Sequence, residues 1–295
     1  MGNTHAPIWF AKFGATCAVL LTFCWATPRL FPNLPQFPPL TTDQQQVVVF
    51  DRYFSLPALD VVLVGSSLSY RLKEEFFVGE QIRNAALPGA SPLTGLAIIG
   101  AAPAPRPRII AVEANILSRA IDNSLFQKFK NAGRSDDGFR PLRTVAAYYQ
   151  RALDDRLTLS DARKQSILNG PATTRNVERA VATTVLEWNK PYFDDAFLKK
   201  NANALFSLVE TMEAQGVRIF LYQLPYLAVV NETLYARMVR KTLAQVFGSD
   251  DNRWLNLEYN VDELRWDDGI HLDERSAIIL ASALGSAISN TKKVR

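Results

Sequence analysis

The chain has 295 residues, of which 48% are hydrophobic and 21% charged, and this is the composition of an ordinary globular protein. The formal net charge of +4 is small and no run of Lys and Arg accompanies it, which argues against nucleic-acid binding. Cys17 and Cys24 both lie in an apolar N-terminal segment, and His271 is the only imidazole beyond that segment. The folded part therefore has no disulfide, no thiolate metal site and no zinc site built on two His residues.

The N-terminal segment is apolar over residues 8–26, with Lys12 as its one charge. Such a segment has three interpretations: a cleaved signal peptide, a lipoprotein signal or an uncleaved anchor. A lipoprotein signal requires a small residue before its cysteine, but Phe23 precedes Cys24. No clean small-x-small cleavage site is present either. We therefore expect residues 1–27 to form a single-pass transmembrane anchor in the inner (cytoplasmic) membrane, with the domain on its extracytoplasmic side.

A proline-rich stalk is expected next, over residues 28–43, because five prolines lie between Pro28 and Leu40. From residue 44 to residue 295, short apolar runs alternate with longer amphipathic ones, which predicts a parallel sheet covered by helices on both faces. We expect strands at Asp60–Gly65, Gln81–Leu87, Arg106–Asn115 and Gly216–Pro225, with a short fifth at Trp254–Leu257. Helices are expected at Ser67–Phe77, Ser91–Ala101 and Ile278–Ile288. The predicted fold is thus a three-layer α/β/α domain with a mostly parallel sheet of about five strands.

The segment between the third and fourth strands, residues 116–215, is far longer than one crossover helix needs. Its pattern is helical throughout, and residues 118–200 carry 15 Lys and Arg against 10 Asp and Glu. We expect a helical insertion at one end of the sheet, serving as a substrate lid or a partner surface. Extra helices that enlarge the core are the alternative.

Polar residues stand where the expected strands end, and the carboxyl ends of parallel strands form the functional edge of such a sheet. The first strand leads into Gly65-Ser66-Ser67, the second into Asn84–Ser91, and the third into Glu113-Ala114-Asn115. Asp268 precedes His271 by three residues just before the last helix. Each of these signals alone also fits a turn, a helix cap or a structural histidine. Together they supply a nucleophile, a base, a group that orients the base, and hydrogen-bond donors.

These residues resemble the sequence blocks of the SGNH (GDSL-type) hydrolase superfamily. Ser67 has the nucleophile position of its first block, and Asp268-Gly269-Ile270-His271 matches the Asp-x-x-His of its last block. The resemblance implies a Ser67–His271–Asp268 triad. It also implies an oxyanion hole formed by the backbone N–H groups of Ser67 and Gly89 and the side-chain amide of Asn115. Asn84 through Gly89 has the spacing of the second block, and Asn115 matches the side-chain donor of the third. The four blocks thus occur in family order over most of residues 60–275.

The chain departs from this family pattern in two of the blocks. Ser66 replaces the usual Asp before the nucleophile, and Glu113 and Ile116 replace the Gly and the terminal Asp of the third block. Two serines in the first block are similar to the branch of membrane-anchored proteins that act in teichoic-acid D-alanylation and exopolysaccharide O-acetylation. The departures argue against activity on simple lipid esters and favour the possibility of a degenerate site.

The sequence therefore predicts a membrane-anchored serine O-acyltransferase or esterase that acts on O-acyl groups of a cell-envelope or secreted polysaccharide. The resemblance implies a polysaccharide or acylated glycan as substrate, a multi-pass membrane acyltransferase as partner, and neither metal nor organic cofactor. Hydrolysis and transfer use the same catalytic residues, and the expected anchor favours transfer. The alternative is a catalytically inactive binding or scaffold subunit of a membrane acyl-transfer complex, which the departures at Ser66 and in the third block favour.

Overall fold

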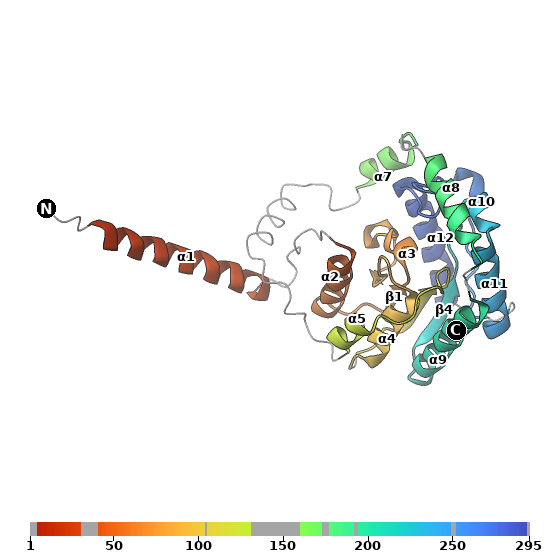
Figure 1. Cartoon of the computed structure of the whole chain (residues 1–295), viewed down its shortest axis with the longest axis horizontal. Coiled ribbons are helices and arrows are strands. Elements are labelled where there is room, and N and C mark those ends of the chain that lie inside the picture. The colour runs from red at the N-terminus through yellow and green to blue at the C-terminus, as the bar shows by residue number, and fades with distance from the viewer. Residues whose placement is uncertain are drawn as a thin grey trace.

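The computed structural model describes residues 5–30, 41–103, 105–130, 160–172, 177–191, 194–248 and 252–293. In these residues a small parallel sheet is surrounded by helices, and helix α1 (His5–Leu30) lies apart from the other elements (Figure 1). The chain is thus a mixed α/β protein, as its alternation of apolar and amphipathic segments predicts.

Within the described residues, four parallel strands form the sheet, in the order β2-β1-β3-β4. They are β1 (Val61–Val64), β2 (Ile82–Asn84), β3 (Ile109–Glu113) and β4 (Arg218–Tyr222). Every residue of β1 and β3 is buried, because helices cover both faces of the sheet. The register pairs Leu63 of β1 with Asn84 of β2 and Ala111 of β3, so the carboxyl ends of these three strands meet at one edge.

The expected fifth strand at Trp254–Leu257 is wrong. Trp254 forms only an isolated parallel bridge with Leu221 of β4. Two backbone hydrogen bonds hold it there, from Leu221 N–H to Arg253 O and from Leu255 N–H to Leu221 O. The side chains that follow alternate between exposed and half-buried, so this segment runs along the surface instead of extending the ladder.

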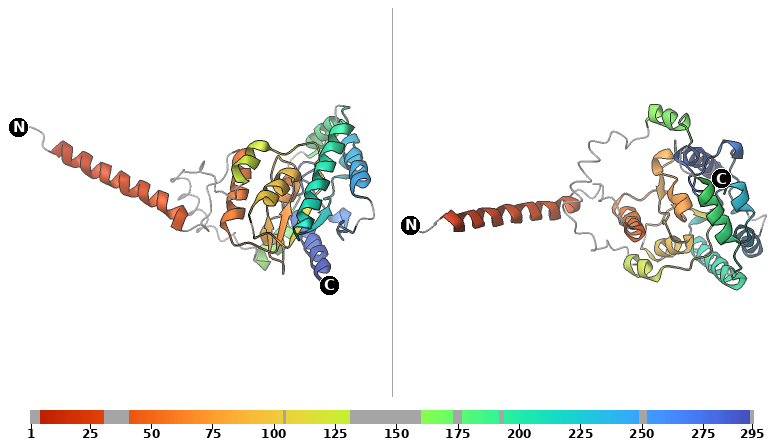
Figure 2. Two further views of the ribbon diagram at one scale, coloured as in Figure 1. Left: turned by 90° about the horizontal axis from the view of Figure 1, so that it is seen from below. Right: turned by 45° about the horizontal axis from the view of Figure 1, so that its top comes forward.

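Two apolar cores lie on opposite faces of the sheet, because successive residues of a strand point to opposite sides. Val62 and Val64 pack into one core, and Val61 and Leu63 into the other. The first face is covered by α2 (Thr42–Ser55), α4 (Pro92–Ala101), α9 (Asp195–Ala214) and α11 (Leu234–Phe247). The second is covered by α3 (Ser67–Tyr70), the 3-10 helix η1 (Glu74–Phe76), α10 (Ala228–Asn231) and α12 (Glu274–Lys293). Figure 2 shows helices on both sides of the strands.

The segment predicted as a helical insertion, residues 116–215, contains α5 (Asn123–Phe129), α7 (Asp161–Leu168), α8 (Val177–Trp188) and α9. Residues 131–159 of this segment lie outside the described residues. Helix α9 packs against α4 and α11 and buries Leu198, Leu205 and Val209 in the core. This part of the segment therefore enlarges the core, while α8 packs against α10 and α11. The 3-10 helix η4 (Val261–Glu263) lies outside the segment, in the stretch before α12.

The helix expected at Ser67–Phe77 is shorter than predicted, because α3 ends at Tyr70 and η1 follows after Lys73. The Asn84 side-chain amide donates to Ser69 O and Leu72 O, at 2.7 Å each, and so binds carbonyls that a longer helix would use. The nucleophile candidate Ser67 therefore stands at the start of a single helical turn. A helix dipole can contribute much less to this position than an eleven-residue helix would.

The N-terminal prediction concerned a transmembrane anchor at residues 1–27 and a stalk at residues 28–43. Helix α1 exposes several large apolar side chains, among them Trp9, Phe10 and Val19. Within the described residues, no helix combines the length and hydropathy that crossing a membrane requires. Residues 31–40 of the predicted stalk lie outside the described residues.

Candidate active site

Ser67 is the first residue of α3 and follows β1 after only two residues, Gly65 and Ser66. A Cβ placed on Gly65 would lie 2.8 Å from the Cβ of Glu113, so only glycine allows the ends of β1 and β3 to approach this closely. Ser66 caps α3 by accepting a hydrogen bond from Leu68 N–H at 3.2 Å. The strand, the glycine and the cap together fix where Ser67 lies.

Three side chains predicted from distant parts of the sequence form one hydrogen-bonded chain. Ser67 Oγ lies 2.7 Å from His271 Nε2, and His271 Nδ1 lies 2.7 Å from Asp268 Oδ2. Since an ionised carboxylate only accepts hydrogen bonds, Nδ1 carries the proton when Asp268 is ionised. The free lone pair on Nε2 is then directed at the Ser67 hydroxyl, which is the arrangement that removal of its proton requires.

The loop that carries His271 is shaped by its own backbone contacts. Asp268 Oδ1 accepts hydrogen bonds from the backbone N–H groups of Ile270 and His271, at 3.2 and 2.7 Å. Gly269 has a φ of +87°, and a Cβ there would lie 2.6 Å from the Val181 side chain of α8. Glycine is therefore required at this turn, both for its φ and for the space.

An ion pair joins this loop to the nucleophile helix. Arg71, which follows the last residue of α3, donates to Asp267 Oδ2 at 2.5 Å and to Leu272 O at 3.2 Å. Because Asp267 and Leu272 flank His271 on both sides, the contact links the backbone around the imidazole with the end of α3. These two contacts hold the His271 loop against the residue after α3, and so help to set the distance between Ser67 and His271.

The electrostatics of Asp268 favour its charged form. Burial raises the pKa of this carboxyl, but the hydrogen bonds and charge of His271 and the Ile270 N–H oppose it and bring the pKa to about 2. Asp268 is therefore ionised at neutral pH and can orient the His271 imidazole and stabilise its protonated form. The side chains of His271 and Asp268 are 20% and 37% exposed, so this end of the triad is open to solvent.

The structure reveals a buried carboxylate beside the nucleophile that the sequence analysis treated only as a departure from a family pattern. Glu113, at the end of β3, is fully buried. Its Oε2 accepts hydrogen bonds from Ser66 N–H at 2.7 Å and from Ser66 Oγ at 2.6 Å, and its Oε1 accepts one from Asn115 N–H at 2.9 Å. Ser66 and Ser67 therefore point to different partners. An acidic residue ending an otherwise apolar strand was the available signal for this site.

The two further residues expected in the oxyanion hole have contacts of their own. Asn115 is buried, and its amide exchanges two hydrogen bonds with the main chain of Leu224, at 2.8 Å each. Gly89 has a φ of +73° and packs against Thr42 of α2. Within the described residues, no hydrogen bond joins either of them to the triad. Their role at the oxyanion therefore stays a prediction.

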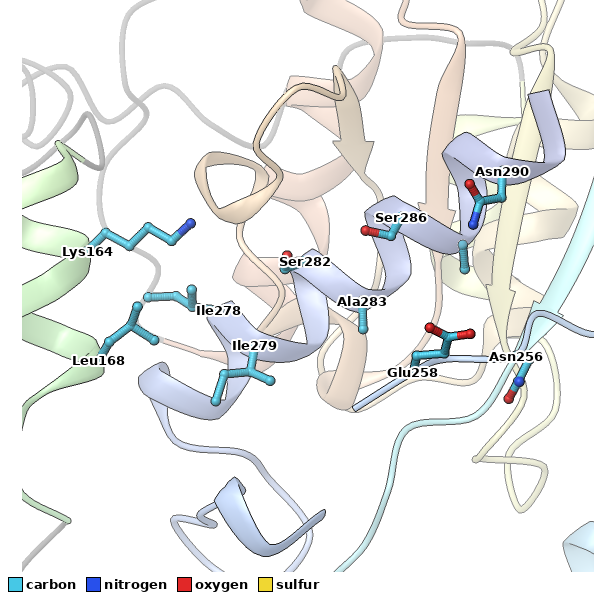
Figure 3. A pocket seen from close by; sticks show the side chains of 11 residues that line it. Lys164, Leu168, Asn256, Glu258, Ile278, Ile279, Ser282, Ala283, Ser286 and Asn290 are labelled. Carbon is cyan, nitrogen blue, oxygen red and sulfur yellow. The ribbon is translucent and has the colours of Figure 1, made fainter. Parts of the chain in front are cut away.

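A hollow of about 430 Å³ lies beside α12 and is distinct from the triad (Figure 3). Its lining includes Ile279, Ser282 and Ser286 of α12, Lys164 of α7, and Glu258. Ser67, Asp268 and His271 do not line it. No cluster of metal-binding side chains occurs within the part of the chain that the structure describes.

Comparisons with family models, with curated proteins and with solved structures found no match. The family resemblance therefore rests on the four sequence blocks and stays a prediction. The contacts between Ser67, His271 and Asp268 are an observation independent of it.

Proposed function

We propose that the chain is a serine acyl-ester enzyme with Ser67 as nucleophile, His271 as general base and Asp268 as the group that orients the base. The observation that carries this proposal is the pair of 2.7 Å contacts from Ser67 Oγ to His271 Nε2 and from His271 Nδ1 to Asp268 Oδ2. Ser67 begins α3, while His271 and Asp268 share one loop more than 200 positions later in the sequence, and the order of the three contacts is that of a proton-transfer chain.

In the first step, Ser67 Oγ attacks the ester carbonyl while its proton passes to His271 Nε2. Asp268 stabilises the imidazolium that forms, and His271 then gives the proton to the leaving alkoxide as the ester bond breaks. In the second step, water or a sugar hydroxyl loses its proton to His271 and attacks the acyl-enzyme. Ser67 then leaves and recovers a proton, so the enzyme is regenerated without a metal or an organic cofactor.

The oxyanion formed in both steps needs hydrogen-bond donors. The Ser67 backbone N–H is one candidate, because it lies at the start of α3 and has no intrahelical acceptor. Gly89 N–H and the Asn115 amide complete the proposed hole. One of the two amide hydrogens of Asn115 is already given to Leu224 O, so only the second is left for the oxyanion.

The proposed substrate is an O-acylated polysaccharide, and the proposed reaction is acyl transfer or hydrolysis. The partial exposure of His271 and Asp268 supports a bulky substrate that approaches from solvent. The extracytoplasmic, membrane-tethered location is proposed from the apolar N-terminal segment, and the multi-pass acyltransferase partner from the family resemblance. The apolar side chains that α1 exposes are compatible with a membrane-facing helix.

The second candidate is an inactive binding or scaffold subunit of a membrane acyl-transfer complex. The engagement of the Asn115 amide by Leu224 favours it, because this contact ties up part of the predicted oxyanion hole. The intact Ser67–His271–Asp268 chain argues for the enzyme instead, since binding alone does not need it.

The proposal is tested by incubating the full-length chain, purified in mild detergent, with an activated acetyl ester in the presence and absence of oligosaccharides. Oriented acceptors reach effective molarities of about 10⁵ M or more, so a bound sugar outcompetes water for the acyl-enzyme. A transferase gives acetylated sugar, and an esterase gives acetate alone. If the chain consumes no more ester than its Ser67→Ala variant does, the enzyme proposal fails and the scaffold proposal replaces it.

A further inference from the structure

The carboxylate of Glu113 lies beneath the nucleophile loop and binds two separate pieces of main chain. It accepts the N–H groups of Ser66 and Asn115, and it also accepts the Ser66 hydroxyl. Ser66 belongs to the loop after β1, and Asn115 to the loop after β3. One fully buried side chain therefore joins the ends of two neighbouring strands at the edge where Ser67 lies.

The orientation of Ser66 is fixed by these contacts. Its hydroxyl donates to Glu113 and accepts from Leu68 N–H, so both its hydrogen and a lone pair are used within α3 and β3. Hydrogen bonds to a charged acceptor are roughly twice as strong as neutral ones. Because Ser66 and Ser67 are adjacent, a fixed Ser66 restricts the backbone that directs the Ser67 hydroxyl towards His271.

A second layer of contacts surrounds the carboxylate. Ser69 Oγ lies 2.7 Å from the Tyr222 hydroxyl of β4 and 3.5 Å from Glu113 Oε2. Burial raises the pKa of Glu113 above its ordinary value, and the hydrogen bonds from Ser66, Asn115 and Ser69 offset only part of this rise. A carboxyl that is costly to bury and yet bonded to several donors indicates a role other than apolar packing.

We propose that Glu113 is a positioning residue for Ser67 and acts through Ser66, an inference that rests on the proposed serine chemistry. In the family that the sequence resembles, an Asp stands before the nucleophile and a Gly begins the third block. Here a serine stands before the nucleophile and a glutamate begins the third block. In this chain the carboxylate therefore stands on the strand next to the nucleophile loop, and the Ser66 hydroxyl connects the two.

The test compares Glu113→Gln and Glu113→Ala with Glu258→Gln, a matched control at an exposed glutamate. Gln at position 113 preserves shape, but its NH₂ group cannot accept a hydrogen bond, so one of the backbone N–H groups now bonded to Glu113 faces another donor. The readouts are kcat and KM for an activated ester and the rate constant of Ser67 inactivation by a fluorophosphonate, all measured well below the melting temperature.

Both Glu113 variants are expected to lose about 10²-fold in kcat and in the inactivation rate, the cost of misplacing a reacting group by about 1 Å, with little change in KM. A residue that only stabilises the fold would lower the melting temperature and leave these rates unchanged. The double variant Ser66→Asp/Glu113→Ala returns a carboxylate to the first block and is expected to recover about tenfold over Glu113→Ala. Wild-type rates in both single variants would overturn the inference.

A structural readout keeps this inference separate from the proposed function. In a crystal structure of Glu113→Ala, the distance from Ser67 Oγ to His271 Nε2 is expected to exceed about 3.5 Å, beyond hydrogen-bond reach. If it stays at the 2.7 Å of the unmodified chain, Glu113 does not position Ser67. This result is obtained even from an inactive chain. A wild-type protein inert to esters and fluorophosphonate would instead count against the proposed function alone.

Discussion

The adjacent serines Ser66 and Ser67 are expected to respond differently to loss of the hydroxyl group. Ser67→Ala should act mainly on turnover, and Ser66→Ala mainly on stability. Ser67 bonds to a partly exposed imidazole, whereas Ser66 is buried and bonds to Leu68 N–H and Glu113. Ser67→Ala should therefore abolish turnover and cost about 1 kcal/mol or less of unfolding free energy. Loss of a nucleophile from a catalytic triad lowers turnover by a factor of the order of 10⁶.

Ser66→Ala should instead act mainly on stability. Loss of an N-cap costs about 0.5–2 kcal/mol, and loss of a hydrogen bond to a charged group about 1.5–3 kcal/mol. The cap contact is long at 3.2 Å and α3 has four residues, so the lower values apply. We expect a decrease of about 2–3 kcal/mol in the free energy of unfolding, with turnover lowered about tenfold through the looser nucleophile loop.

The assay pairs urea unfolding followed by tryptophan fluorescence with hydrolysis of an activated acetyl ester. Ser207→Ala, at an exposed position on α9, is the matched control and should match the wild type in both measurements. An inactive Ser66→Ala beside an active Ser67→Ala would place the nucleophile one residue earlier and refute the assignment. A Ser66→Ala variant as stable as the wild type would refute the role given to the Glu113 contacts.

Three further outcomes follow from the site. His271→Gln should be as inactive as Ser67→Ala, and the double variant no worse than either in ester hydrolysis, because residues that act as a unit are not additive. The folded-state pKa of Asp268 is lowered to about 2 from 3.8, so the stability it contributes is present above pH 4 and lost as the pH falls through 2. The stability difference between wild type and Asp268→Asn in urea titrations should therefore shrink over that range, and a constant difference would contradict the pKa. Gly269→Ala should lower turnover by displacing His271, because its Cβ would lie 2.6 Å from Val181, and unchanged kinetics would contradict the described turn.

The sheet was the most predictable part of the fold. The strands Val61–Val64 and Ile109–Glu113 are short, apolar except for Glu113, and bounded by turn residues, so their type and order follow from the pattern. Helix α2 was missed because its apolar residues include a short β-branched run, Val47-Val48-Val49, which is more typical of a strand, and because its place in the fold depends on tertiary contacts. One of these is the bond from Gln46 to Pro88 O, which no local pattern encodes.

The limits of helix prediction are clearest at α3. The sequence from Ser67 to Phe77 has helical spacing, yet Asn84, which ends the second strand, binds two of its carbonyls and ends the helix early. This competition involves residues 12 and 15 positions apart, and local propensity does not contain it. The fifth strand failed for a similar reason, because only two backbone hydrogen bonds join its segment to β4.

The candidate site also has a part that the sequence predicts and a part that it does not. Ser67, Asp268 and His271 were predicted because few residue types have their chemistry, and the structure brings all three together. Glu113 was noted only as a departure, because its significance comes from a neighbouring strand. The contacts of Asn115 with Leu224 likewise depend on how the loops after β3 and β4 meet. Residue identity thus predicted the triad, and tertiary contacts determined its surroundings.

The central claim is that Ser67 is an activated nucleophile, and covalent labelling tests it most directly. The full-length chain is treated with a fluorophosphonate, digested, and the modified peptide located by mass spectrometry. The account predicts one adduct on Ser67, absent from Ser67→Ala and formed far more slowly in His271→Gln. An unlabelled wild-type chain, or equal labelling of wild type and His271→Gln, would contradict it.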